Sequence, residues 1–277
     1  MTDKYAVIGY PIGHSKSPLI HAAFAKQTTQ DISYEAIEAP LNCFEVKVRE
    51  LIAQGYMGAN VTVPFKFEAF KLCDELTQRA QLASAVNTLT FKQNKIYGDN
   101  TDGVGLVSDI TQNLNVSINQ KSVLLMGAGG AAYGVVLPLL EAGALLSVAN
   151  RTPEKAVQLA NTFNQLSLGT SKVKAGEFNL FNNQPFDIVI NATSTGLTDD
   201  LPDIGVNNFA TSALAYDMMY SRVTPFMALA KTAGAQVADG LGMLVQQAAE
   251  AFYNWRGVRP STQAVIEMLK ALQMEKS

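Results

Sequence analysis

The first hundred residues alternate short apolar runs with stretches whose apolar residues recur at helical spacing. The apolar runs predict strands at 5–9 ("YAVIG"), 33–39 ("SYEAIEA") and 58–63 ("GANVTV"). Two further runs, 85–91 ("AVNTLTF") and 95–100 ("KIYGDN"), flank a short polar turn. They therefore predict a β-hairpin.

Helices are predicted between these strands. Ser17 followed by Pro18 is typical of a helix start, with serine as the N-cap and proline in the first helical position. The apolar residues that recur at helical spacing after Asn42 are Phe44, Val48, Leu51 and Ile52. They predict a second helix that ends before Gly55, and Pro64 predicts the start of a third.

From about residue 103 the chain alternates strictly between predicted helices and predicted strands. The predicted strands are "SVLLM" at 122–126, "LLSVA" at 145–149, "FDIVINAT" at 186–193, "LAYDMMY" at 214–220 and "QVADG" at 236–240. The first predicted helix is 103–114. Others follow the glycine-rich turn after 126, start at Pro153, and cover "TPFMALAKTAG" at 224–234. Two amphipathic helices at about 241–255 and 261–273 end the chain. This alternation predicts right-handed βαβ units on a parallel sheet.

Composition narrows the class of protein. The 277 residues are 48% hydrophobic and 16% charged, which is typical of a globular chain, and the net charge of −3 provides no drive toward nucleic acid or acidic membranes. The N-terminal segment predicts a strand rather than a leader, and no apolar stretch is long enough to span a membrane. Cys43 and Cys73 suggest neither a disulfide framework nor a metal site. A cytoplasmic protein is expected.

A glycine-rich turn marks a nucleotide site. Gly127, Gly129 and Ala132 form G-x-G-x-x-A directly after a predicted strand and at the start of a predicted helix. Glycines there permit a tight turn and a close approach of the backbone to a pyrophosphate, which the helix N-terminus favours electrostatically. The alternative is a purely structural turn, but the strand–turn–helix context favours nucleotide binding.

The end of the next predicted strand indicates which nucleotide binds. NAD sites place a carboxylate there to hold the ribose 2′-hydroxyl. This chain instead has Asn150, Arg151 and Thr152, with Lys155 one helical turn further on. Arg151 can grip a 2′-phosphate with its planar guanidinium, so NADP is the predicted cofactor, although a solvated surface arginine is the plainer alternative.

"NVTVPFK" at 60–66 places a lysine just after a strand and a proline. Lys66 is predicted in the first helical turn, where the macrodipole disfavours a second positive charge and helps the ammonium give up a proton. A nearby carboxylate would oppose that effect. Taken alone, Lys66 is better interpreted as a solvated surface lysine.

Several unusual motifs together resemble the shikimate dehydrogenase family. They are "GYPIGHSKSP", "GANVTVPFK", "AVNTL", "GDNTDG", "GAGGAA", "NRT", "NATSTG", "YDMMY" and "DGLGMLVQQAAEAF", in the family's order across essentially the whole chain. The resemblance implies an NADPH-dependent, reversible reduction of 3-dehydroshikimate to shikimate in aromatic amino acid biosynthesis. "NATSTG" departs from the more usual Ser-Ser-Gly, and Gln78 stands where an acidic residue often lies.

The resemblance also implies site residues. Lys66 and Asp102 match the catalytic pair. The substrate-binding positions are Ser15, Ser17, Thr62, Asn87, Tyr220 and Gln247. The cofactor-binding positions are Gly127, Ala128, Gly129, Gly130, Ala131, Asn150, Arg151, Thr152, Lys155, Met218 and Gly242. No metal is implied.

These residue types suit the chemistry. Short hydroxyl and amide side chains both donate to and accept from a small polyhydroxylated acid. Hydride transfer to a carbonyl leaves an alkoxide that needs a proton, which Lys66 can supply while Asp102 orients it. Each residue also has a structural alternative: Ser17 as a helix cap, Asn87 and Asp102 as turn or cap residues, and Met218 as buried packing.

The predicted fold class is α/β with two domains. Residues 1–102 form an α/β substrate-binding catalytic domain, 103–239 a Rossmann-like doubly wound NADP-binding domain, and 240–277 helices that return to the first. The active site is expected in the cleft between domains, in a monomer or homodimer. Three alternatives stay open: an NAD-dependent quinate/shikimate dehydrogenase, a folate-type methylene dehydrogenase, and a non-catalytic NADP-responsive regulator.

Overall fold

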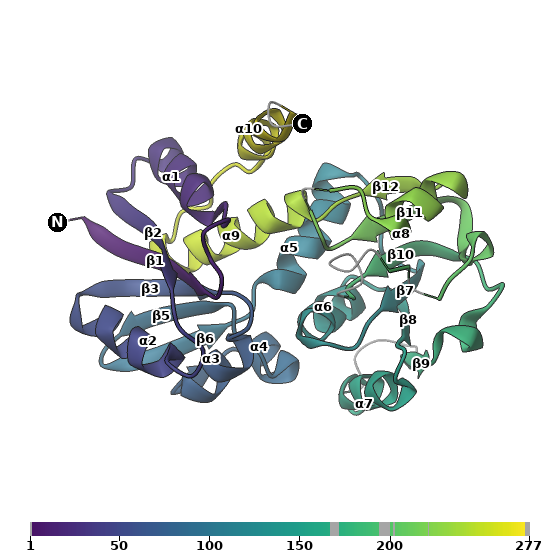
Figure 1. Ribbon diagram of the computed structural model, residues 1–277, viewed down its shortest axis with the longest axis horizontal. Coiled ribbons are helices and arrows are strands. Elements are labelled where there is room, and N and C mark those ends of the chain that lie inside the picture. The colour runs from purple at the N-terminus through teal and green to yellow at the C-terminus, as the bar shows by residue number, and fades with distance from the viewer. Residues whose placement is uncertain (1, 167–171, 194–199, 202, 221, 275–277) are drawn as a thin grey trace. The chain divides into compact units, whose positions relative to one another are not determined.

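The computed structural model describes residues 2–166, 172–193, 200–201, 203–220 and 222–274. Its Cα packing separates the chain into two compact bodies (Figure 1). The first body contains Met1–Gly105 and Val245–Ser277, and the second contains Leu106–Leu244. Residues 194–196 of "NATSTG" lie outside the description. The functional domains predicted above at 1–102, 103–239 and 240–277 stay predictions.

The first body contains a six-stranded mixed sheet. Its strands are β1 (Asp3–Gly9), β2 (Ile32–Glu38), β3 (Tyr56–Val61), β4 (Glu75–Leu76), β5 (Thr88–Lys92) and β6 (Lys95–Asp99). They lie in the order β2-β1-β3-β5-β6-β4. β1 pairs in parallel with β2 and β3, whereas β5 is antiparallel to both β3 and β6. The predicted β5–β6 hairpin is therefore confirmed, and it makes the sheet mixed rather than wholly parallel.

Helices connect these strands. They are α1 (Ser17–Thr28), α2 (Phe44–Ala53), α3 (Lys66–Leu72), α4 (Gln78–Ala83), α5 (Asp102–Ser108), α9 (Leu241–Arg256) and α10 (Gln263–Met274). Phe44, Val48 and Leu51 of α2 are buried, as their spacing predicted. Ile52, which was grouped with them, is 37% exposed because it lies off this buried stripe. The boundaries between the two bodies fall within α5 and α9.

The second body has a six-stranded, wholly parallel sheet. Its strands are β7 (Ser122–Met126), β8 (Leu145–Ala149), β9 (Lys174–Gly176), β10 (Phe186–Asn191), β11 (Phe209–Asp217) and β12 (Gln236–Ala238), in the order β12-β11-β10-β7-β8-β9. The helices are α6 (Gly130–Glu141), α7 (Pro153–Asn164) and α8 (Pro225–Thr232), with a π-helical turn at Asp109–Asn113 and short 3-10 turns at Phe178–Phe181 and Val206–Asn208. The strand order reverses between β7 and β10. In a doubly wound sheet, ligands bind at the carboxyl ends of the strands at this point.

The start of α1 differs from the prediction. The helix begins at Ser17 itself, and Lys16 precedes it without a side-chain cap. The prediction that Ser17 is the N-cap is therefore wrong. Instead, the Ser15 hydroxyl accepts a hydrogen bond from the Ser17 N–H at 3.3 Å. Ser15 thus satisfies the first N–H of the helix, because a serine hydroxyl reaches the backbone two residues further on.

A cluster of charged and polar groups holds the C-terminal helix α9 to the first body's sheet. Asp99, at the end of β6, accepts hydrogen bonds from Thr77 Oγ1 at 2.6 Å, Arg79 Nε at 2.6 Å and Asn254 Nδ2 at 2.8 Å. Arg79 also contacts Glu250 of α9 at 3.2 Å. Burial raises the pKa of Asp99, but the hydrogen bonds and charge of Arg79 outweigh it, so the net pKa lies below the ordinary value.

Arg79→Ala should lower the free energy of unfolding by about 3–5 kcal/mol at pH 7, because it leaves the buried Asp99 carboxylate without its cation. A carboxylate whose pKa is lower in the native state than in the unfolded state stabilises the fold above the unfolded pKa of about 3.9. This stabilisation is lost as the pH falls through the native pKa. Urea denaturation should therefore show the difference between wild type and variant narrowing as pH falls below about 4. Lys95→Ala, which removes a half-exposed pair with Glu75, is the control and should cost about 0–1 kcal/mol. Equal losses for both variants would contradict the account.

Candidate active site

Lys66 and Asp102 form a close ion pair in the first body. Lys66 Nζ lies 2.6 Å from Asp102 Oδ2, and the two side chains are 22% and 10% exposed. Lys66 is the first residue of α3, so its predicted place in a first helical turn is confirmed, although Pro64 lies before the helix rather than inside it. Asp102 opens α5, where the helix dipole favours its negative charge. The carboxylate that would oppose proton loss from Lys66 is therefore present.

Asn87 joins this pair to the rest of the predicted substrate residues. Its side-chain Nδ2 donates to Asp102 Oδ1 at 2.8 Å and lies 3.3 Å from Gln247 Oε1 of α9. Its Oδ1 accepts from the Thr101 N–H at 2.9 Å. Four residues predicted from separate parts of the sequence (Lys66, Asn87, Asp102 and Gln247) thus share one hydrogen-bonded network.

Buried residues that the sequence analysis missed extend this network. Asn60 of β3 donates to Thr88 Oγ1 at 3.1 Å and accepts from Tyr34 Oη at 2.7 Å. Thr88 Oγ1 in turn donates to Asn87 Oδ1 at 2.9 Å. Asn60 is 6% exposed and Thr88 is fully buried. A signal was available for Asn60, since an amide inside the apolar run "GANVTV" needs partners.

Tyr34 connects the network to the first residue of α1. Burial raises the pKa of the Tyr34 phenol well above its ordinary value, and a hydrogen bond with Ser17 acts in the opposite direction. Ser17 is itself 6% exposed. The His21 ring stacks on Tyr34 with ring centres 4.0 Å apart, and burial lowers the pKa of His21 to about 3. A neutral imidazole therefore backs the phenol that approaches Ser17.

The remaining predicted substrate residues of the first body lie at one edge of its sheet. β1 and β3 are parallel neighbours, so their carboxyl ends lie side by side. Ser15 follows β1, and Thr62 follows β3 with its N–H bonded to Ile8 O at 2.9 Å. Lys66 comes from the same end of β3. The structure thus brings the hydroxyls, the amides and the ion pair to this edge. Tyr220 belongs to the second body, where burial raises the pKa of its phenol.

The glycine turn of the second body has the geometry of a phosphate-binding loop. Gly127 follows β7 with φ of +104°, and a Cβ there would lie 3.1 Å from the Ala192 carbonyl, so only glycine fits. At Gly129 a Cβ would meet no atom within 4 Å, which leaves the loop backbone open to a ligand. Gly130 and Ala131 begin α6, whose first N–H groups lack helical partners. Ala128, between the glycines, is 9% exposed.

The second cofactor segment follows the neighbouring strand. β8 pairs with β7, so Asn150, Arg151 and Thr152 leave the sheet at the same edge as the glycine turn. Arg151, Thr152 and Lys155 are exposed. The Asn150 amide donates to the Thr152 carbonyl at 2.8 Å, which stabilises the loop locally. Arg151 and Lys155 are therefore exposed cations on the segment that leaves the sheet beside the glycine turn.

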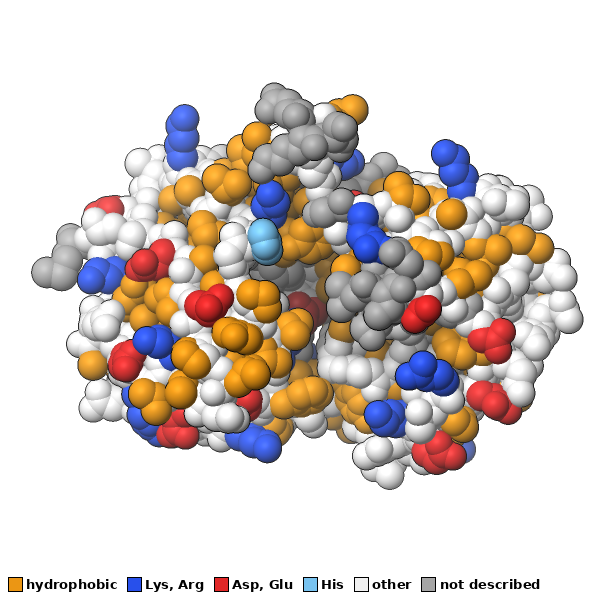
Figure 2. Space-filling view, in the orientation of Figure 1, with side chains coloured by type: hydrophobic (Ala, Val, Ile, Leu, Met, Phe, Trp, Pro, Cys, Tyr) orange, Lys and Arg blue, Asp and Glu red, His pale blue; other side chains and the backbone are white. Residues whose placement is uncertain are grey.

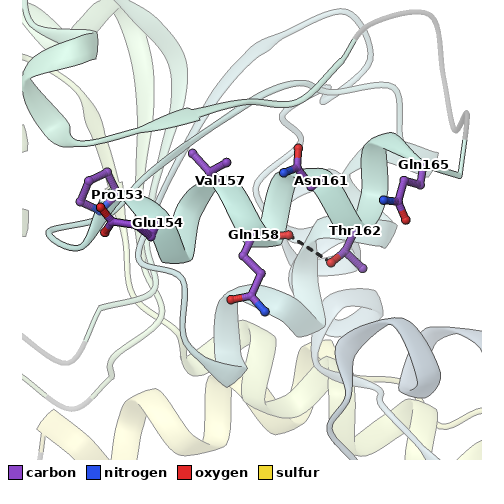
Figure 3. A pocket seen from close by; sticks show the side chains of 7 residues that line it. All are labelled: Pro153, Glu154, Val157, Gln158, Asn161, Thr162 and Gln165. Carbon is purple, nitrogen blue, oxygen red and sulfur yellow. Dashed lines mark hydrogen bonds between the residues drawn. The ribbon is translucent and has the colours of Figure 1, made fainter.

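A surface depression of about 630 Å³ lies along α7 but is a different feature (Figure 3). It is lined by Pro153, Glu154, Val157, Gln158, Asn161, Thr162 and Gln165. All belong to one helix and its end, and none is a predicted cofactor residue. The depression does not lie at the carboxyl edge of the sheet, where doubly wound folds bind their ligands.

The segments that carry Met218 and Gly242 meet in the second body. Met218 follows β11, and its N–H donates to the Asn191 carbonyl at 3.0 Å. Gly242 is the second residue of α9. A Cβ on nearby Gly240 would lie 2.3 Å from the Met218 carbonyl oxygen, so the end of β11 and the start of α9 are in close contact.

On the face shown in Figure 2, positive and negative side chains are interspersed on both bodies. Among the residues that the structure describes, no helix is both long and apolar enough to traverse a lipid bilayer. Within the same residues, no three histidine, cysteine or carboxylate side chains come together as metal ligands would.

Three family models match consecutive parts of the chain. The shikimate dehydrogenase substrate binding domain matches residues 7–89, shikimate / quinate 5-dehydrogenase matches 108–198, and the shikimate 5′-dehydrogenase C-terminal domain matches 240–270. The chain belongs to the shikimate dehydrogenase family. The resemblance inferred from the motifs is therefore confirmed.

Relatives of the family match nearly the whole chain. A protein of Methylobacillus flagellatus named shikimate dehydrogenase (NADP(+)) is 57% identical over 271 residues, which cover 97% of this chain and 99% of the relative. The crystal structure of an Ael1 enzyme from Pseudomonas putida is 46% identical with a TM-score of 0.91 and covers 97% of this chain and 98% of its own. The structure of shikimate 5-dehydrogenase from Thermus thermophilus in complex with NADP(H) and shikimate is 31% identical with a TM-score of 0.84, covering 96% and 98%. The two-domain α/β fold with a Rossmann-like domain is confirmed by these neighbours.

Thr88→Val should test the buried network. It keeps the shape of the side chain but leaves Asn60 and Asn87 each short of one buried hydrogen bond, so it should cost about 1–3 kcal/mol of unfolding free energy. The side-chain amide resonances of Asn87 should shift with it in an NMR spectrum.

Thr90→Val, two residues further along β5 and half-buried, is the matched control and should change stability by less than about 0.5 kcal/mol. If the two variants lost equal stability and left the Asn87 resonances in place, Thr88 would have no part in orienting Asn87.

Proposed function

We propose that this protein catalyses the reversible, NADPH-dependent reduction of 3-dehydroshikimate to shikimate, a step of the shikimate pathway that leads to chorismate and the aromatic amino acids. The observation that carries the proposal is the Lys66–Asp102 ion pair of 2.6 Å, set among Asn87 and Gln247 in a chain of this family. A cytoplasmic location, and a monomer or homodimer, belong to the same proposal.

The proposed proton path uses Lys66. NADPH, when bound, supplies the hydride to the substrate carbonyl. The oxygen that becomes an alkoxide then takes a proton from the Lys66 ammonium, and in the reverse direction neutral Lys66 accepts it. The 22% exposure of the Lys66 side chain lets it exchange that proton with solvent. Asp102 orients the ammonium and is itself held by Asn87, so the donor is positioned before the substrate binds.

Recognition of the substrate is assigned to hydroxyl and amide groups. Ser15 and Ser17 are proposed to bind the carboxylate, and Thr62, Asn87 and Gln247 the ring hydroxyls. The proximity of Ser15, Thr62 and Lys66 at one sheet edge supports this assignment for the first body. Tyr220 is proposed as a further substrate contact from the second body.

The second body is proposed to hold NADP. Its glycine turn, Gly127 to Ala131, offers open backbone N–H groups to the pyrophosphate, and the open space at Gly129 fits this role. Asn150, Arg151, Thr152 and Lys155 are proposed to bind the adenine ribose and its 2′-phosphate. Met218 and Gly242 are proposed to meet the nicotinamide.

The direct test follows NADPH oxidation with 3-dehydroshikimate, compared with 3-dehydroquinate and with NADH. The proposal expects the highest kcat/KM for the 3-dehydroshikimate and NADPH pair. Preference for 3-dehydroquinate and NADH would favour the quinate enzyme, a folate-type dehydrogenase would act on neither substrate, and NADPH binding without turnover would favour a regulator.

Lys66→Ala should lower kcat by about 10²–10⁴, because loss of a positioned proton donor typically has this effect. The dissociation constant for NADPH should stay near the wild-type value, since Lys66 belongs to the first body and the glycine turn to the second. Lys71→Ala, later in α3, is the control for general effects of removing a lysine from this helix. A Lys66→Ala variant with wild-type kcat would remove Lys66 from the mechanism.

Asn150→Asp combined with Arg151→Ala should reverse the cofactor preference. The new carboxylate repels the 2′-phosphate and the lost guanidinium no longer pairs with it, so kcat/KM for NADPH should fall at least about tenfold, or roughly 1.4 kcal/mol. Use of NADH should stay level or rise. A parallel fall with both cofactors would show that the substitutions act on folding instead.

A further inference from the structure

Asp109 is a buried carboxylate of the second body for which the proposed mechanism has no use. It begins the π-helical turn Asp109–Asn113 and is 3% exposed. Its Oδ2 accepts a hydrogen bond from Tyr216 Oη at 2.6 Å, and its Oδ1 accepts one from Asn113 Nδ2 at 2.6 Å. Both partners are neutral, so these bonds stabilise a costly buried charge and restrict its side chain to one position.

That carboxylate fills the space beside Gly242. A Cβ on Gly242 would lie 1.9 Å from Asp109 Oδ1, 2.3 Å from Cγ and 2.4 Å from Oδ2. Real Cβ atoms do not approach other atoms so closely. The Asp109 side chain is short and held by two hydrogen bonds, so it has little freedom to move aside. Gly242 does not need a left-handed backbone. It is glycine because Asp109 occupies the place of its side chain.

Asp109 also holds the segment that meets this helix start. Tyr216 lies in β11, two residues before Met218, and burial raises the pKa of its phenol well above the ordinary value, with the nearby Asp109 charge adding to the effect. The phenol therefore stays protonated and donates to Asp109. The Gly240 N–H donates to the Met219 carbonyl at 2.9 Å, which joins the same two segments through the backbone.

We propose that Asp109 is a positioning residue for the cofactor. Asp109 sets the distance between the end of β11 and the start of α9. Met218 and Gly242, one on each segment, are thereby preorganised to receive the nicotinamide half of NADP. The inference rests on the proposed function for the identity of the cofactor. It assigns the lack of a side chain at position 242 to the protein's own carboxylate rather than to contact with the nicotinamide.

The experiment is a double-mutant cycle read as NADPH affinity, measured by fluorescence titration without substrate. Gly242→Ala should raise the dissociation constant at least about tenfold, because the added methyl displaces Asp109. Asp109→Ala should raise it less, and the Asp109→Ala/Gly242→Ala variant should bind within about threefold of Asp109→Ala, since the clash is gone. Gly205→Ala, whose Cβ would meet nothing within 4 Å, is the matched control in the same body.

Tyr216→Phe tests the same role of Asp109 without adding an atom. It removes one hydrogen bond that holds Asp109, so it should also weaken NADPH binding. All affinities are measured well below each variant's melting temperature, so a purely structural role would lower that temperature and leave the dissociation constant unchanged. A lower melting temperature with an unchanged dissociation constant would overturn the inference. So would wild-type NADPH affinity in Gly242→Ala, or a double variant whose loss of affinity is the product of the two single losses. NADPH binding without turnover would overturn the proposed function alone, whereas a wild-type protein unable to bind NADPH would overturn both.

Discussion

The ion pair between Lys66 and Asp102 is the interaction on which the site of the first body depends. Each residue is the first of a short helix. The strands that precede the two helices bring these helix starts, and so the two charged groups, together. The pair is partly shielded from water, so its geometry has to be set by other groups. Asn87 supplies that constraint by bonding to the carboxylate oxygen that Lys66 does not contact.

The constraint continues through the sheet. From Asn87 it passes through Thr88 to Asn60 and then to Tyr34, each link a hydrogen bond of 3.1 Å or shorter between side chains. A buried polar chain of this kind is costly unless every member is satisfied, but when satisfied it specifies one arrangement. The same principle acts in the second body, where Asp109 and Tyr216 set the position of a helix start.

Much of this could be predicted from the sequence, because strong periodicity and proline and glycine punctuation are local signals. The β5–β6 hairpin, the parallel second sheet and the glycine turn all follow from such signals. Short elements such as β4 and α4 were missed, since two and six residues provide too little periodicity. The N-cap at Ser17 was wrong because the helix begins one residue earlier than predicted, with Ser17 as its first residue and its N–H bonded to the Ser15 hydroxyl. Two contacts join residues far apart in the chain, that of Asn60 with Tyr34 and that of Asp109 with Gly242. No local sequence pattern predicts such contacts.

The central claim is that Lys66 and Asp102 act as one unit. The most direct measurement compares kcat for 3-dehydroshikimate reduction in Lys66→Ala, Asp102→Ala and the double variant. Residues that act as a unit are strongly non-additive, so the double variant should be no slower than the slower single variant. If instead the two losses multiplied, the residues would contribute independently, and the ion pair would not be the proton-transfer device described.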